Sequence, residues 1–221
     1  AGSGYDVTYN QPEQGVYQLD FTLGDYNLTT LSIDGVDYTK LVFEGSVMTD
    51  LKGFAELPYI SSSVQLSADK NVTLKVIAEE YEDILINEPM LPSRGVIYRD
   101  QDPASIPYEI APGSLRDEFY PQNIAKTTSP FIIKDIRGTS VYVHPFRYNA
   151  AQNVLRVYTS VTVQLIENES APVNPLTVQP TTVLREMHSI YKSVFINYSE
   201  ASKDLDIGEF GDILVLCTSR D

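Results

Sequence analysis

Few side chains in this chain have the type and spacing that catalysis or metal binding requires. Its only cysteine is Cys217, and its only histidines are His144 and His188. A thiolate nucleophile needs a nearby base and an exposed, electropositive setting. Cys217 instead ends an apolar run, where a small buried thiol is ordinary, and the two histidines lack the HExxH-type spacing of a metal site. We therefore expect structural or surface roles for all three residues, with no catalytic residue, no bound metal and no cofactor.

The acidic balance of the chain argues against several classes of partner. The formal net charge is -14, and lysine and arginine are nowhere clustered. Nucleic acids and anionic membranes are bound through basic patches, so neither is an expected partner. No apolar stretch of about 18 residues is present, so no membrane-inserted segment is expected. The acidic run 79–83 lacks the spacing of a calcium loop, and we interpret it as a solvated strand end.

One cation has a setting suited to molecular recognition. Arg99 follows Tyr98 in the sequence YRDQDP. A guanidinium forms bidentate, charge-assisted hydrogen bonds with carboxylates, as in an acidic binding pocket. On the residues alone, the simpler interpretation is a surface arginine paired with Asp100 or Asp102. Arg94 is the neighbouring arginine that could take the recognition role instead.

The elements that hold these residues are predicted to be short strands, because apolar and polar residues alternate with a period of two. Turn signals lie between them at Asp34-Gly35, at Arg137-Gly138 and at 148–153. Many short strands rich in Tyr, Val and Thr, with little helix, predict an antiparallel β-sandwich. The predicted strands are 16–21, 36–43, 63–66, 72–77, 131–136, 140–144 and 154–163.

Residues 87–130 interrupt this pattern with repeated prolines. Proline fixes φ and donates no ladder hydrogen bond, so a central strand is implausible over most of the segment. We expect a long, partly rigid excursion from the sandwich, and loops of this length are usually functional or disordered. The aromatic side chains of Tyr98, Tyr108 and Phe119 favour an ordered loop.

The C-terminal part of the chain contains a helical pattern, then a polar segment, then an apolar run. Apolar residues from Val183 to Phe195 recur at spacings of three and four, which predicts one amphipathic helix. A polar, acidic segment, 199–211, then precedes a continuous apolar run at 212–217, typical of a strand buried on both faces of a parallel sheet. We therefore expect a β-sandwich domain at 1–198, a linker at 199–211, and at 212–221 the first strand of an α/β domain.

Several segments occur in an order that resembles the pro-domains of gingipains, which are secreted cysteine endopeptidases of anaerobic oral bacteria and their relatives. The resemblance is nearly collinear from about Gly53 onward. The segments that carry it are LPSRGVIYRDQDPASIPY at 91–108, FYP at 119–121, PFIIKDIRG at 130–138, YN at 148–149, LRVY at 155–158, IYKSVFINY at 190–198 and ILVL at 213–216.

This resemblance implies a β-sandwich pro-domain of a secreted or cell-surface bacterial enzyme. It implies that the cognate catalytic domain is the partner, and that the pro-domain holds that domain latent and assists its folding. In the family the catalytic His and Cys lie downstream of the strand at 212–221, so this chain is expected to have no activity. The resemblance further makes Arg99 a pseudo-substrate, flanked by Tyr98 and Asp100 in an inhibitory loop. The corresponding residue is arginine in arginine-specific members and lysine in a lysine-specific one.

One departure from the family pattern concerns release of the pro-domain. Arginine-specific members cut after an arginine between the helix and the catalytic strand, whereas 199–211 contains only Lys203. Lys203 is therefore the possible processing site. Two other interpretations stay open: an adhesin-like β-sandwich that serves as a binding module, and a chain that acts mainly as a folding chaperone.

Overall fold

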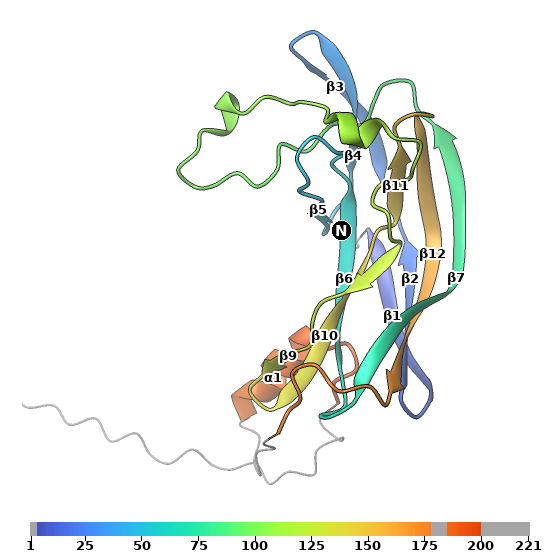
Figure 1. Cartoon of the computed structure of the whole chain (residues 1–221), viewed down its shortest axis with the longest axis vertical. Coiled ribbons are helices and arrows are strands. Elements are labelled where there is room, and N and C mark those ends of the chain that lie inside the picture. The colour runs from blue at the N-terminus through green and yellow to red at the C-terminus, as the bar shows by residue number, and fades with distance from the viewer. Residues whose placement is uncertain (1–3, 178–184, 200–221) are drawn as a thin grey trace, which may run out of the picture.

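The computed structural model describes residues 4–177 and 185–199, and these residues form a mainly antiparallel β fold. Two five-stranded sheets and a two-stranded hairpin make up the architecture, with one α-helix at the C-terminal end of the described chain (Figure 1). The predicted fold class is confirmed.

The first sheet is organised around its longest central strand, β12. Strands β2 and β11 pair with one edge of β12, and β7 pairs with the other edge along its whole length. The order along the sheet is β1-β2-β12-β11, with β7 flanking β12. The strands are β1 (Tyr5–Glu13), β2 (Val16–Leu23), β7 (Asn71–Leu85), β11 (Phe146–Asn149) and β12 (Val154–Asn168).

The second sheet has the order β5-β6-β10-β8, with β9 also paired to β10. Its strands are β5 (Val47–Met48), β6 (Pro58–Gln65), β8 (Ala125–Thr127), β9 (Phe131–Ile133) and β10 (Ile136–Val143). The separate hairpin joins β3 (Asn27–Ile33) to β4 (Val36–Val42). Asp34 and Gly35 both have positive φ, 50° and 81°, which is the backbone that a tight two-residue hairpin turn requires.

The main core lies between the two sheets. Alternate side chains of β2, β6, β10 and β12 point into it, and Leu19, Val64, Val141 and Val163 have no exposed surface. Burying each such side chain contributes about 1.5–3 kcal/mol, so the period-two pattern supplies the dominant stabilisation of the sandwich.

A second, smaller core forms under helix α1 (Arg185–Val194). Tyr191 and Phe195 are fully buried there and pack with Ile136. A β-carbon at Gly138 would lie 2.3 Å from the Phe195 ring, so the close approach of this ring to β10 requires glycine. Ile190 is 44% exposed, so the apolar face of the helix is narrower than predicted.

The turn predicted at Arg137-Gly138 is wrong, because both residues lie inside β10. The strand predicted at 131–136 is instead split by a turn at Lys134-Asp135, where Lys134 adopts a φ of 54°. Arg137 is 1% exposed. Its guanidinium donates to four backbone carbonyls, those of Ser67, Lys70, Val173 and Asn174. In the sequence, a buried arginine followed by a glycine that packs against an aromatic ring has the same pattern as a turn.

Strands β1, β3, β5, β8 and β11 lie outside the predicted strands. The acidic run 79–83 lies within β7 instead of at a strand end. β7 is an edge strand whose side chains are mostly exposed, including Ile77 and Tyr81. A strand solvated on both faces keeps no clean hydrophobic alternation, and so its length cannot be recognised from the pattern.

Some expectations fall outside the described residues. These are the linker from residue 200, Lys203, the strand at 212–217 with Cys217, and the first turn of the predicted helix. Among residues 4–177 and 185–199, no helix combines the length and the apolarity needed to cross a membrane.

Candidate functional site

The proline-rich excursion is present between β7 and β8, and part of it, residues 94–110, projects from the sandwich. We call this part the arm. Figure 1 shows the arm leaving near β4 and returning beside β11, at the opposite end of the sandwich from α1. The arm contains one short 3-10 helix, η1 (Pro103–Ser105), and a second, η2 (Pro112–Leu115), follows it.

Arg99 lies in a tight turn of the arm. The backbone N–H of Gln101 donates to the carbonyl of Tyr98 at 3.0 Å, and the side-chain oxygen of Gln101 accepts from the Tyr98 N–H at 2.9 Å. Arg99 and Asp100 are thereby the two central residues of a β-turn. Tyr98, Arg99 and Asp100 are all exposed, so the three residues proposed for the inhibitory loop form one accessible surface.

The simpler interpretation of Arg99, a surface ion pair with a neighbouring carboxylate, is not supported. Within the described residues Arg99 takes part in none of the ion pairs. Asp102 instead caps η1, accepting from the Ala104 N–H at 3.0 Å. A guanidinium without an internal partner loses no ion pair when it enters an acidic pocket.

Arg94, the other candidate arginine, is engaged within the arm. Its Nη1 donates to the carbonyl of Pro103 at 2.5 Å. Its guanidinium carbon also lies 4.5 Å from the centroid of the Tyr108 ring, within the range of a cation–π contact. Arg94 therefore links the outgoing limb of the arm to the returning limb, whereas Arg99 makes no ion pair with the residues that the structure describes.

Gly53 joins the two ends of the arm. Its N–H donates to the carbonyl of Ser93 at 2.8 Å, and its carbonyl accepts from the N–H of Ala111 at 3.0 Å. The residue has a φ of 80°, in the left-handed region that favours glycine. Sequence reasoning missed this role, because a glycine that receives two distant segments has no signature in the local pattern.

The segment that follows the arm is fixed to the first sheet by two arginines. The Phe119 ring lies 4.3 Å from the guanidinium of Arg156 and 5.6 Å from that of Arg147. Arg147 also donates to the carbonyl of Pro121 at 2.7 Å. Arg156 makes two hydrogen bonds to Asp83, at 2.7 and 2.8 Å, and these hold the pKa of Asp83 below its ordinary value. The FYP and LRVY segments thus meet, and YN joins them because the N–H of Tyr120 donates to the carbonyl of Tyr148 at 2.9 Å. We call this group of contacts the anchor of the arm.

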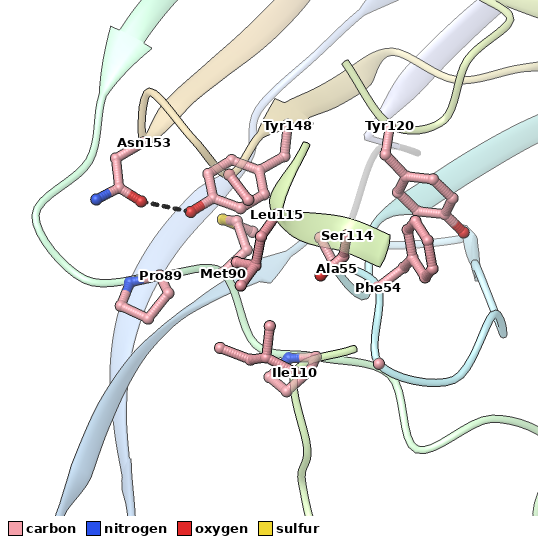
Figure 2. A pocket seen from close by; sticks show the side chains of 13 residues that line it. Phe54, Ala55, Pro89, Met90, Ile110, Ser114, Leu115, Tyr120, Tyr148 and Asn153 are labelled. Atoms are coloured by element: carbon pink, nitrogen blue, oxygen red, sulfur yellow. Dashed lines mark hydrogen bonds between the residues drawn. The ribbon is translucent and has the colours of Figure 1, made fainter. Parts of the chain in front are cut away.

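An apolar pocket lies between the ends of the arm and the sandwich (Figure 2). Figure 2 shows Tyr148 and Asn153 on one side of the pocket, with Tyr120 and Phe54 on the other. The hydroxyl of Tyr148 donates to Asn153 Oδ1 at 2.6 Å. The rings of Phe54 and Tyr120 are 4.8 Å apart. No acid or base lines this pocket. Its lining is mostly apolar, so it is suited to an apolar side chain.

The two histidines have structural roles, as expected. His144 is 3% exposed, and its Nδ1 lies 2.9 Å from the carbonyl of Asn123. Burial lowers the pKa of His144 to about 4, so this side chain is neutral at pH 7. The Nδ1 of His188 lies 2.5 Å from the hydroxyl of Tyr198, in the small core under α1.

Comparison with known proteins gives one consistent result. The profile of the family Propeptide_C25 matches residues 4–205. Gingipain R2 of Porphyromonas gingivalis is 31% identical over 212 residues, which are 94% of this chain and 28% of that protein. Gingipain R1 of the same species is 30% identical over 84% of this chain and 18% of its own length. The chain therefore spans less than a third of the length of these curated relatives.

Solved structures agree with this result. The complex of Porphyromonas gingivalis RgpB pro- and mature domains contains a chain that superposes with a TM-score of 0.77 at 29% identity. The match covers 87% of this chain and 98% of that one. A structure that concerns the zymogenic latency of gingipain K, from the same species, superposes with a TM-score of 0.65 at 16% identity and shares the fold.

Proposed function

This chain belongs to the Propeptide_C25 family, and we propose that it holds the catalytic domain of a gingipain-type cysteine endopeptidase latent. In this proposal the arm occupies the active-site cleft, with Arg99 in the specificity pocket. The partner is the cognate catalytic domain, and the protein acts outside the bacterial cell or at its surface. The observation that carries the proposal is the exposed turn at Tyr98, Arg99 and Asp100, presented on an anchored arm.

Arg99 has the chemistry that an arginine-selective pocket requires. Such a pocket offers carboxylate acceptors, and a guanidinium satisfies them bidentately. The side chain of Arg99 is exposed and makes no ion pair within residues 4–177 and 185–199, so docking breaks none of the ion pairs there. The fixed turn also reduces the conformational entropy that binding must remove. These features favour Arg99 over Arg94, whose guanidinium is already committed to Pro103 and Tyr108.

The same turn explains how a pseudo-substrate escapes rapid cleavage. The bond after Arg99 lies between the two central residues of the turn, closed by the hydrogen bond from Gln101 to Tyr98. Acyl transfer requires the carbonyl to reach a near-attack geometry with the nucleophile, and small misplacements lower the rate strongly. A cleft that must accept Arg99 in a turn therefore binds the arm without cutting it quickly.

The proposal extends to residues beyond the arm. We propose that 1–198 form the inhibitory domain, that 199–211 form the linker, and that 212–221 begin the catalytic domain. Lys203 is the proposed processing site, because 199–211 contain no arginine. The chain also assists folding of the catalytic domain by binding its native state in preference to the unfolded state.

Titration of the mature cognate catalytic domain with this chain tests the proposal. Inhibition with one-to-one stoichiometry, and a complex that survives gel filtration, are the expected results. An adhesin-like module would leave the peptidase fully active and free of bound chain, and that outcome would refute the proposed function. Refolding the catalytic domain with and without the chain measures the folding role separately.

A further inference from the structure

We infer that Arg94 is a positioning residue that keeps the arm an inhibitor instead of a substrate. This inference rests on the proposed function, because it concerns how Arg99 is presented to the peptidase. Arg94 itself need not touch the enzyme. It acts by holding the two limbs of the arm together on either side of the turn at Arg99.

The contacts of Arg94 close a small loop around Arg99. The hydrogen bond from Arg94 Nη1 to the Pro103 carbonyl, 2.5 Å long, spans nine residues and encloses the turn. Stacking of the guanidinium on Tyr108, at 4.5 Å, adds a second link to the returning limb. A closed loop has fewer conformations than an open one, so the pose of Arg99 is fixed before binding.

The returning limb is itself ordered where Arg94 meets it. Pro103 begins η1, whose N-cap is Asp102. The side chain of Ser105 donates to the Asp102 carbonyl at 2.7 Å, which reinforces the same turn. Arg94 therefore binds a carbonyl that belongs to an ordered turn. Because that carbonyl is fixed, the hydrogen bond restricts the position of the outgoing limb.

Arginine is the residue that this position needs. Its planar guanidinium can donate to a carbonyl and stack on an aromatic ring at the same time. A lysine ammonium at this position could make either contact, but its geometry does not combine them. The Tyr108 hydroxyl has no role in this arrangement, because the contact with Arg94 is made through the ring.

We call the link from Arg94 to Pro103 and Tyr108 the brace. It matters most after the bond between Arg99 and Asp100 has been cut. Cutting transfers the Arg99 carbonyl from the Asp100 nitrogen to the cysteine sulfur of the peptidase, and the Asp100 amine takes up a proton as it leaves. Water then hydrolyses the thioester. While Arg94 holds the limbs together, the new amine stays close, so it can attack the thioester and remake the peptide bond before water does. Without the brace the amine moves away, and hydrolysis completes the cut.

Variants of the full chain test this inference. We expect Arg94→Ala to raise the inhibition constant for the cognate mature peptidase about tenfold, the combined loss of one hydrogen bond and one exposed cation–π contact. The bond between Arg99 and Asp100 should also be cut faster, as measured by mass spectrometry of timed samples. Tyr108→Ala should behave like Arg94→Ala, whereas Tyr108→Phe should retain wild-type inhibition and wild-type resistance to cutting.

Two outcomes would overturn the inference. One is an unchanged inhibition constant and cutting rate for Arg94→Ala. The other is a weaker inhibition without faster cutting, because that result would indicate a direct contact between Arg94 and the enzyme. Failure of the proposed function is recognised differently, since the wild-type chain itself would then not inhibit. Thermal unfolding of each variant, expected to match that of the wild type, confirms that the sandwich is intact.

Discussion

Gly53 and Ala111 approach so closely that a β-carbon added to Gly53 would lie 2.6 Å from the β-carbon of Ala111. Ala111 follows the last residue of the arm, and Ser93, which precedes the arm, is hydrogen-bonded to the same glycine. One residue outside the excursion thus sets the distance between its two ends. The arm is a loop closed at its base by Gly53, and its first residue, Arg94, links across to Pro103 and Tyr108 on the returning limb.

This contact predicts that Gly53→Ala weakens inhibition of the cognate peptidase. The added methyl group must displace Ala111, and the left-handed backbone adds strain, so we expect a loss of about 1–3 kcal/mol in the free energy of unfolding. Gly35→Ala is the matched control. Gly35 has nearly the same φ, 81°, but a β-carbon there meets no atom within 4 Å. The control should lose stability only through backbone strain and should inhibit like the wild type. Equal inhibition by both variants would refute the role of Gly53.

The contact between Gly138 and Phe195 predicts a stability effect at the other end of the sandwich. Gly138→Ala places a methyl group against the Phe195 ring, and overpacking of this kind costs about 1–3 kcal/mol. Phe195→Leu in the same chain should recover part of the loss by making room. Denaturant unfolding of the two single variants and the double variant measures the coupling. If the changes in the free energy of unfolding of the two single variants simply add in the double variant, the Phe195 ring is not the reason that position 138 needs glycine.

The low pKa of His144 predicts a pH dependence of stability. The folded state holds the pKa near 4, whereas an unfolded histidine titrates near 6.5. Between these values the unfolded chain binds the extra proton, so stability falls as the pH is lowered from about 7 to 4, by up to about 3 kcal/mol. His144→Gln should lack this component of the slope, and His188→Gln should keep it. Denaturant unfolding at several pH values measures the slope, and an unchanged slope in His144→Gln would contradict the assignment.

The sandwich and the arm could be predicted from the sequence because each has a local chemical cause. Alternation of apolar residues marks β2, β4 and β12, and prolines mark where the ladder stops. Arg99 was singled out through the resemblance of its surroundings, and its role as a pseudo-substrate stays a prediction. The solvated edge strand β7 could not be delimited, since exposure on both faces removes the periodicity that defines a strand.

The parts that could not be predicted depend on contacts between distant segments. In the sequence Gly138 has the pattern of a turn glycine, and only its contact with Phe195, far along the chain, shows its role. Arg94 and Arg99 are chemically equivalent in the sequence, and only the positions of Pro103 and Tyr108 distinguish the engaged arginine from the exposed one. Gly53 likewise acquires its role from Ser93 and Ala111. The resemblance segments FYP, YN and LRVY proved to be one anchor for the same reason.

The inhibition constant of Arg99→Ala tests the proposal that Arg99 fills the specificity pocket of the cognate peptidase. We expect a loss of about 2–5 kcal/mol in binding free energy, because one member of a desolvated charge pair is removed. Arg116→Ala is the matched control, since Arg116 is an exposed arginine near the arm, and its one ion pair among the described residues, with Glu118, is 4.0 Å long. We expect wild-type inhibition by Arg116→Ala and a large loss of inhibition for Arg99→Ala. Wild-type inhibition by Arg99→Ala would contradict the proposal.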